Sequence, residues 1–234
     1  MNRTIPNGAA ILLAFIRHTE VGRDDRASYD VIYANGQGKL AKPLTSMTYG
    51  DIIDAQRSWS KNHGSSAAGA YQFMRATLID LAKANPSISG ADLFTPELQD
   101  ELGYQLLQRR GYDLFIAGKI DRTEFGKRLS QEWASFPVLT ATKGAKRDLK
   151  RGQSYYAGDG LNKALVSPEK VESVLDQVKV AGNLAVAKPE PVAPEPAPAS
   201  PGAVAAGAGI AALIAAAAAY LSNLPCSWFG FMCG

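Results

Sequence analysis

Glu20 is the residue whose position in the sequence best suits acid–base chemistry. Apolar residues recur at helical spacing before it: Ile11, Leu12, Phe15 and Ile16. They predict an amphipathic helix over residues 8–20 that stops near Gly22. A carboxylate at that end faces the negative end of the helix dipole, and burial would disfavour its charge further. Both effects raise its pKa, as a general acid working near neutral pH requires; the alternative is an ordinary solvated glutamate.

A second candidate feature is the segment from Gly64 to Met74, in which small residues precede the sequence Tyr71-Gln72-Phe73. This composition predicts a loop whose backbone comes close to a ligand, followed by the start of a helix. Because sugars offer apolar faces and amide edges, Tyr71 could stack on a sugar and Gln72 could hydrogen-bond an acetamido group. Ser66, in the same loop, is also a candidate substrate-binding residue. The alternative is a tight glycine turn with a buried aromatic residue.

The elements that must position these residues are mainly helical. Residues 29–50 mix β-branched and aromatic residues with Asn-Gly, and they predict a small hairpin or ragged sheet. Helix starts are marked by capping residues, in two cases with proline at the first helical position: Thr95-Pro96, Asp121 with Glu124 three residues on, and Ser167-Pro168. We expect the helix after Asp121 to end at Pro137. The predicted fold class is therefore α+β, mainly helical with a small β excursion.

Composition excludes several classes of protein. Among 234 residues 46% are hydrophobic and 20% are charged, which excludes a wholly disordered chain. The net charge of +3 comes from dispersed Lys and Arg, so no nucleic-acid partner is predicted. His18 and His63, with both cysteines confined to the last nine residues, leave no ligand set for structural zinc. We predict no metal and no cofactor.

The chain changes character after residue 187. Residues 188–201 are rich in proline and alanine and predict an extended linker. Residues 202–222 predict a hydrophobic helix, whose apolar stretch 203–221 is long enough to seek or span a membrane; the alternative is a low-complexity tail. Residues 223–234 form a tail with aromatic residues and Cys226 and Cys233, whose redox state the spacing leaves open.

The N-terminal apolar run is too short to span a membrane and lacks a cleavage signature. We therefore expect no cleavable signal peptide and synthesis in the cytoplasm.

Four features in this order resemble one known group of enzymes: a helix ending in Glu20, the sequence Tyr29-Asp30-Val31-Ile32, "AAGAYQF" at 67–73 and "WASFP" at 133–137. Together with "GQSYYAGDGLN" further on, they resemble the lysozyme-like superfamily, and most closely the endolysins of lambdoid phages. The resemblance covers roughly residues 10–160. Between Gly36 and Lys61 the sequence departs from the lambdoid pattern. The resemblance implies that residues 1–187 form a lysozyme-like catalytic domain.

The resemblance implies cleavage of the β-1,4 bond between N-acetylmuramic acid and N-acetylglucosamine in peptidoglycan, with Glu20 as general acid and base. It implies substrate contacts by residues in two segments: Tyr29, Asp30, Ser66, Tyr71 and Gln72. Asp24, Asp25 and Asp30 are candidates for a second carboxylate by proximity, without a distinctive context. If no second carboxylate faces the sugar, the 6-hydroxyl of the muramic acid attacks its own C1, as in the lambdoid relatives. We favour this lytic transglycosylase over a water-using muramidase.

Two further alternatives are a glycan-binding module without catalysis and a protein that acts chiefly through a membrane-active tail. The resemblance also implies a phage protein that reaches the periplasmic peptidoglycan from the host cytoplasm. A holin-type partner would then open the inner membrane, with which residues 203–221 could associate. The sequence leaves open whether the protein acts at lysis or at virion entry, and it does not give the oligomeric state.

Overall fold

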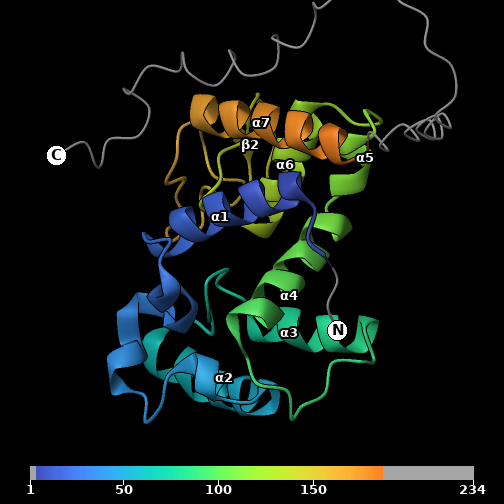
Figure 1. The fold of residues 1–234 in the computed structure, drawn as a ribbon. Helices are drawn as coiled ribbons and strands as arrows, with labels where there is room; N and C mark the ends of the chain where they lie inside the picture. Colours follow the sequence, from blue (N-terminus) through green and yellow to red (C-terminus); the bar gives the residue numbers. More distant parts are fainter. Residues whose placement is uncertain (1–3, 187–234) are drawn as a thin grey trace, which may run out of the picture. The chain divides into compact units, whose positions relative to one another are not determined.

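A computed structural model describes residues 4–186 of the chain. The predicted linker (188–201), hydrophobic helix (202–222) and tail (223–234) lie outside the described residues. Within residues 4–186, seven α-helices, three short 3₁₀ helices and one pair of strands are described (Figure 1). No helix of this part of the chain is long and apolar enough to span a membrane.

Helix α1 (Asn7–Val21) carries Glu20 in its last turn, as predicted for residues 8–20. Its buried side is apolar and includes Leu12, Leu13 and Ile16. The helix ends because Gly22 adopts the left-handed conformation at φ 72° and donates its N–H to the carbonyl of His18. The position of Glu20 is therefore determined by both helix packing and a defined C-cap.

Helix α7 (Pro168–Val186) packs along α1 (Figure 1). The Ser167 hydroxyl accepts the N–H of Lys170, so the predicted helix start is confirmed. Four apolar side chains of α7 are buried: Val171, Val174, Leu175 and Val178. The two helices approach closely at Gly8, where a Cβ atom would lie 2.6 Å from the Val178 carbonyl oxygen.

The prediction of a hairpin or sheet over residues 29–50 is wrong. This segment forms the 3₁₀ helices η1 (Arg26–Asp30), η2 (Tyr33–Lys39) and η3 (Leu44–Ser46), and the β pairing described for it consists of isolated bridges. Left-handed residues in η2, Ala34 at φ 57° and Asn35 at φ 55°, interrupt extended structure. The described strands lie later in the chain, as the antiparallel pair β1 (Thr142–Lys143) and β2 (Asp148–Leu149).

Helices α2 (Tyr49–His63) and α3 (Arg75–Ala84) pack together next to the 3₁₀ segment. Helix α2 begins with a capping box between Thr48 and Asp51. Helix α4 (Pro96–Arg109) contacts both η1 and α1 and so connects this group to the other helices (Figure 1). Its predicted start is confirmed, because the Thr95 side chain accepts the N–H of Leu98.

Helices α5 (Tyr112–Ile116) and α6 (Arg122–Glu132) complete the group around α1 and α7. Asp121 caps α6 by accepting the N–H of Glu124, as predicted. The helix ends at Glu132, earlier than the expected end at Pro137, so Trp133 and Phe136 lie in the turn that follows. Both aromatic rings remain buried. The mainly helical α+β fold class is thus confirmed for the described part of the chain.

Candidate active site

Glu20 lies where the last turn of α1 meets the turn after α6. The residue keeps some exposure, but protein atoms surround its carboxyl group. Burial raises the pKa of Glu20 from 4.5 to about 7, and a hydrogen bond from Ser135 partly opposes this rise. At neutral pH, therefore, a large fraction of Glu20 holds a proton that it can donate.

Ser135 is the functional residue that sequence reasoning missed. Its hydroxyl donates to Oε1 of Glu20, and the residue is buried. The two residues are 115 positions apart, so no local pattern connects them. The sequence did contain one indication of this contact, because Ser135 lies in the apolar sequence Trp133-Ala134-Ser135-Phe136-Pro137. A hydroxyl that is buried with such neighbours needs a hydrogen-bond partner.

The turn containing Ser135 connects Glu20 with the loop over residues 64–74, which we call the substrate loop because it was predicted to bind substrate. On one side, the Phe136 ring packs edge-on against Phe15 of α1 at 5.5 Å between ring centroids. On the other side, the indole N–H of Trp133 donates to the Tyr71 carbonyl at 3.2 Å. The "WASFP" and "AAGAYQF" segments are therefore in direct contact, and the "WASFP" segment also contacts Glu20 through Ser135.

The substrate loop folds as a tight turn that only glycine permits at position 69. Ala68 and Phe73 exchange two backbone hydrogen bonds, and the Gly69 N–H donates to the Val31 carbonyl at 2.8 Å. Gly69 has φ 75°, and a Cβ there would collide with the Gln99 amide and lie 3.1 Å from the Phe94 ring. The fully buried Gln99 accepts the Ala70 N–H at 2.9 Å.

Tyr71 is 1% exposed, so its ring offers no face on which a sugar could stack. Its hydroxyl donates to Asp100 at 2.5 Å, and the hydroxyl of Tyr29 donates to the same carboxylate at 2.9 Å. Arg17 of α1 donates to the Tyr29 hydroxyl at 2.7 Å. Burial, followed by the charge of Asp100, raises the pKa of Tyr29 to about 12, so this phenol stays neutral. These side chains fix α1, η1, α4 and the substrate loop relative to one another.

Ser66 and Asp30 are likewise engaged within the protein. The Ser66 hydroxyl accepts the N–H of Arg75 at the first turn of α3, at 3.1 Å. Asp30 accepts the N–H of Thr45 at 2.9 Å. Both interactions orient backbone segments beside the loop, and the substrate contacts of these two residues stay a prediction.

Gln72 is the predicted substrate-binding residue with the most freedom to act on a ligand. It has a left-handed backbone at φ 50°, unusual for a residue with a side chain. Its amide nitrogen donates to the Gly69 carbonyl at 2.9 Å. Within residues 4–186 its amide oxygen has no hydrogen-bond partner, and the side chain is partly exposed.

The candidates for a second carboxylate differ in their surroundings. Asp25 forms a bidentate pair with Arg23 at 2.5 and 2.7 Å, and this exposed pairing lowers its pKa. Asp30 is bound to Thr45, and Asp24 is exposed. None of the three shares the buried surroundings of Glu20. No group of three or more His, Cys, Asp or Glu residues in the described part of the chain is arranged to hold a metal ion.

Comparison with known proteins identifies a family. The family model described as "Endolysin" matches residues 10–161, which is more than half of the chain and includes Glu20, the substrate loop and the "WASFP" turn. No curated protein and no solved structure matched the chain. The chain therefore belongs to the endolysin family, and it is a phage enzyme that degrades the peptidoglycan of the bacterial cell wall.

Proposed function

We propose that the enzyme cleaves the β-1,4 bond between N-acetylmuramic acid and N-acetylglucosamine as a lytic transglycosylase, with Glu20 as its general acid and base. The observation that carries this proposal is the Glu20 carboxyl group, whose pKa burial raises to about 7. A carboxylic acid with that pKa can protonate a leaving group and then accept a proton at the same pH.

In the first step Glu20 donates its proton to the glycosidic oxygen while the bond from that oxygen to C1 of the muramic acid breaks. The departing N-acetylglucosamine leaves as a free 4-hydroxyl, and positive charge develops on C1 and the ring oxygen. Glu20 is now a carboxylate that still accepts the Ser135 hydrogen bond. That bond stabilises the ionised form, so Ser135 assists this step.

In the second step the 6-hydroxyl of the same muramic acid attacks C1 and gives its proton to Glu20. A 1,6-anhydro ring forms, and the enzyme returns to its starting protonation state without consuming water. The resemblance to the lambdoid endolysins supports this route; a water-using muramidase would instead need Asp24, Asp25 or Asp30 as a second carboxylate at the sugar. The muramidase remains the alternative on the same fold.

For substrate binding we propose Gln72, whose amide oxygen is available to accept an N–H of an acetamido group. Tyr29, Asp30, Ser66 and Tyr71 then act as supports of the loop. We further propose that the enzyme reaches periplasmic peptidoglycan from the host cytoplasm with a holin-type partner. We also propose that residues 203–221 associate with the inner membrane.

The test compares the full chain with Glu20→Gln and with Asp24→Asn as a matched control. Glu20→Gln keeps the shape and a hydrogen-bond acceptor for Ser135 but cannot transfer a proton. We expect it to lower the release of soluble fragments from purified peptidoglycan at least 1000-fold, a typical loss for a general acid. Asp24→Asn is expected to keep the parent's activity. Full activity of Glu20→Gln would remove Glu20 from the mechanism.

A further inference from the structure

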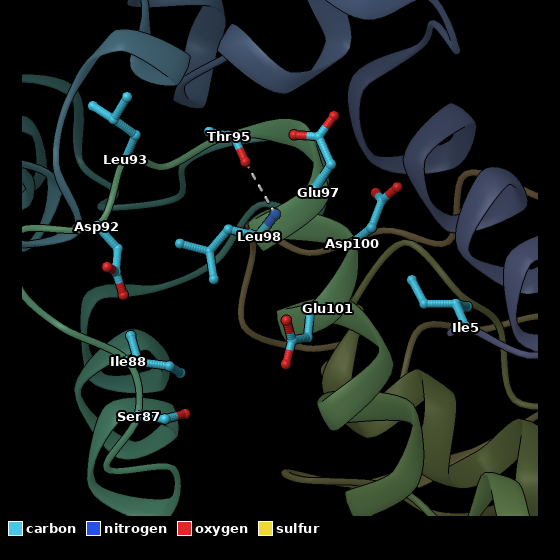
Figure 2. Close-up of a pocket in the computed structure, with 10 residues that line it drawn as sticks. All are labelled: Ile5, Ser87, Ile88, Asp92, Leu93, Thr95, Glu97, Leu98, Asp100 and Glu101. Carbon is cyan, nitrogen blue, oxygen red and sulfur yellow. Dashed lines mark hydrogen bonds between the residues drawn. The ribbon is translucent and has the colours of Figure 1, made fainter. Parts of the chain in front are cut away.

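A second site lies at the amino end of α4. A cavity of about 490 Å³ is lined by residues from the N-terminal segment, the loop after α3 and the first turns of α4 (Figure 2). This volume lies within the range that small-molecule sites occupy. Glu20 and Gln72 are not among the lining residues, so the cavity is separate from the candidate active site.

The lining of this cavity is strongly acidic. Four carboxylates border it, from Asp92, Glu97, Asp100 and Glu101, and no Lys or Arg of the described residues lines it. The whole chain, by contrast, has a net charge of +3. The carboxylates of the cavity therefore attract a cation locally, whereas the positive net charge of the whole chain would repel it.

Three of these carboxylates are already engaged. Asp92 accepts the Ser89 N–H at 2.8 Å. Asp100 accepts hydrogen bonds from Tyr29 and Tyr71. The pKa of Glu97 is lowered chiefly by a hydrogen bond from its own backbone N–H.

Glu101 differs from the other three carboxylates. The residue is 8% exposed, and its Oε1 atom is buried without a hydrogen-bond partner. Figure 2 shows its carboxyl group projecting from α4 into the space that separates the helix from Ile88. A buried carboxylate oxygen without a partner costs free energy, which a bound donor would offset.

We propose that this cavity binds an aliphatic amine, with its ammonium group on the Glu101 carboxylate. An ammonium has three donors and no acceptor, which matches a site made of carboxylates. Ile88, Leu93 and Leu98 line the same cavity and provide apolar contacts for the methylene chain of such a ligand. A metal ion fits less well, since no three of the described carboxylates are grouped as ligands.

The test measures binding of spermidine to the full chain by isothermal titration calorimetry at low ionic strength. We expect binding at one site, weakened as salt is raised, and no binding of suberate, an anion of similar length. Glu101→Gln is expected to weaken spermidine binding at least tenfold, and Glu124→Gln on α6 is the matched control with unchanged binding. Equal binding by the parent and Glu101→Gln, or displacement of spermidine by Mg²⁺ at equal ionic strength, would overturn the proposal.

One more measurement distinguishes a ligand-binding Glu101 from one that only stabilises the fold. Thermal unfolding of Glu101→Gln without ligand is expected at or above the parent's temperature, because a neutral amide costs less to bury than a carboxylate. A purely structural Glu101 would give a lower temperature. We expect Glu20→Gln to bind spermidine as the parent does. The binding proposal and the lytic mechanism can therefore fail independently of each other.

Discussion

At the scale of single residues, the proposed chemistry depends on a carboxylic acid that still holds a proton in a large fraction of molecules at neutral pH. Burial raises the pKa of Glu20, and the Ser135 hydroxyl limits that rise by favouring the carboxylate. The two influences place the pKa at about 7, where donation and acceptance of a proton are comparably easy. Each influence can be removed separately by substitution.

Removing the carboxyl group is expected to change stability with pH. Between pH 4.5 and about 7 the folded protein binds more protons at Glu20 than the unfolded chain, so the free energy of unfolding falls as pH rises through this window. The difference in pKa corresponds to about 3 kcal/mol at most. Glu20→Gln should therefore be more stable than the parent at pH 8 by up to about 3 kcal/mol, and equally stable near pH 4. Urea unfolding at both values measures this.

Asp24→Asn serves as the control in the urea experiment, because Asp24 is exposed and its replacement by an amide of the same shape should change the free energy of unfolding by less than about 0.5 kcal/mol. A Glu20→Gln variant less stable than the parent at pH 8 would show that the ionised carboxylate stabilises the fold, which is incompatible with a pKa raised by burial.

Removing the Ser135 hydroxyl should shift the pH dependence of activity upward. Without this hydrogen bond the pKa of Glu20 rises above about 7, so the alkaline limb of kcat/KM in Ser135→Ala moves to higher pH by about one unit. Ser130→Ala is the matched control: Ser130 is also buried, but its hydroxyl donates to the Lys127 carbonyl at 2.7 Å. A limb that stays in place in Ser135→Ala would show that Ser135 does not act on Glu20.

At the scale of elements, the site is an assembly of three segments distant in sequence. The last turn of α1 holds the acid, the turn after α6 holds Ser135, and the loop over residues 64–74 holds Gln72. Their alignment depends on the close approach of the Gly69 backbone to Gln99. This contact leaves no room for a side chain.

Gly69→Ala is expected to destabilise the protein by about 2 to 4 kcal/mol, because it combines a left-handed backbone with a steric collision. Gly22 provides the matched comparison: its φ is 72°, and a Cβ there would meet no atom within 4 Å. Gly22→Ala should therefore cost only about 1 kcal/mol. Thermal or urea unfolding measures the stability of both variants, and the larger loss in Gly69→Ala reports the steric collision beyond the backbone strain that both share. Equal losses of stability in the two variants would contradict the packing described for the loop.

Local signals were enough to predict helices α1, α4, α6 and α7 and the position of Glu20 at the end of α1, but not the contacts between segments. Apolar spacing predicted α1, and capping residues such as Thr95 and Asp121 predicted α4 and α6, because these depend on neighbouring residues. Residues 29–50 have β-like composition, but they lack strand partners and form 3₁₀ helices. The burial of Tyr71 and its bond to Asp100 likewise arise from tertiary packing, which composition does not encode locally.

At the scale of the whole described molecule, α7 extends the fold beyond the family match. The match ends at residue 161, whereas α7 spans Pro168–Val186 and packs along α1, the helix that carries Glu20. Its buried residues belong to the same core as those of α1. We therefore propose that α7 belongs to the catalytic unit, as the element that covers one side of α1.

Leu175→Ala should show how much α7 contributes to stability. Leu175 is fully buried, so truncation leaves a cavity in the core and should cost about 3 kcal/mol. Leu184, on the same helix but 71% exposed, is the control, and Leu184→Ala should change the free energy of unfolding by less than about 0.5 kcal/mol. Similar small losses in both variants would mean that α7 does not support α1.

The most direct measurement of the mechanism is mass spectrometry of the sugar products formed in water enriched in oxygen-18. We predict that the parent protein forms fragments ending in 1,6-anhydro-muramic acid, one water lighter than reducing ends and without oxygen-18, and that Glu20→Gln forms none. Reducing muramic acid ends that carry oxygen-18 would contradict the transglycosylase mechanism, because they would show that water, and not the sugar's own 6-hydroxyl, attacks C1.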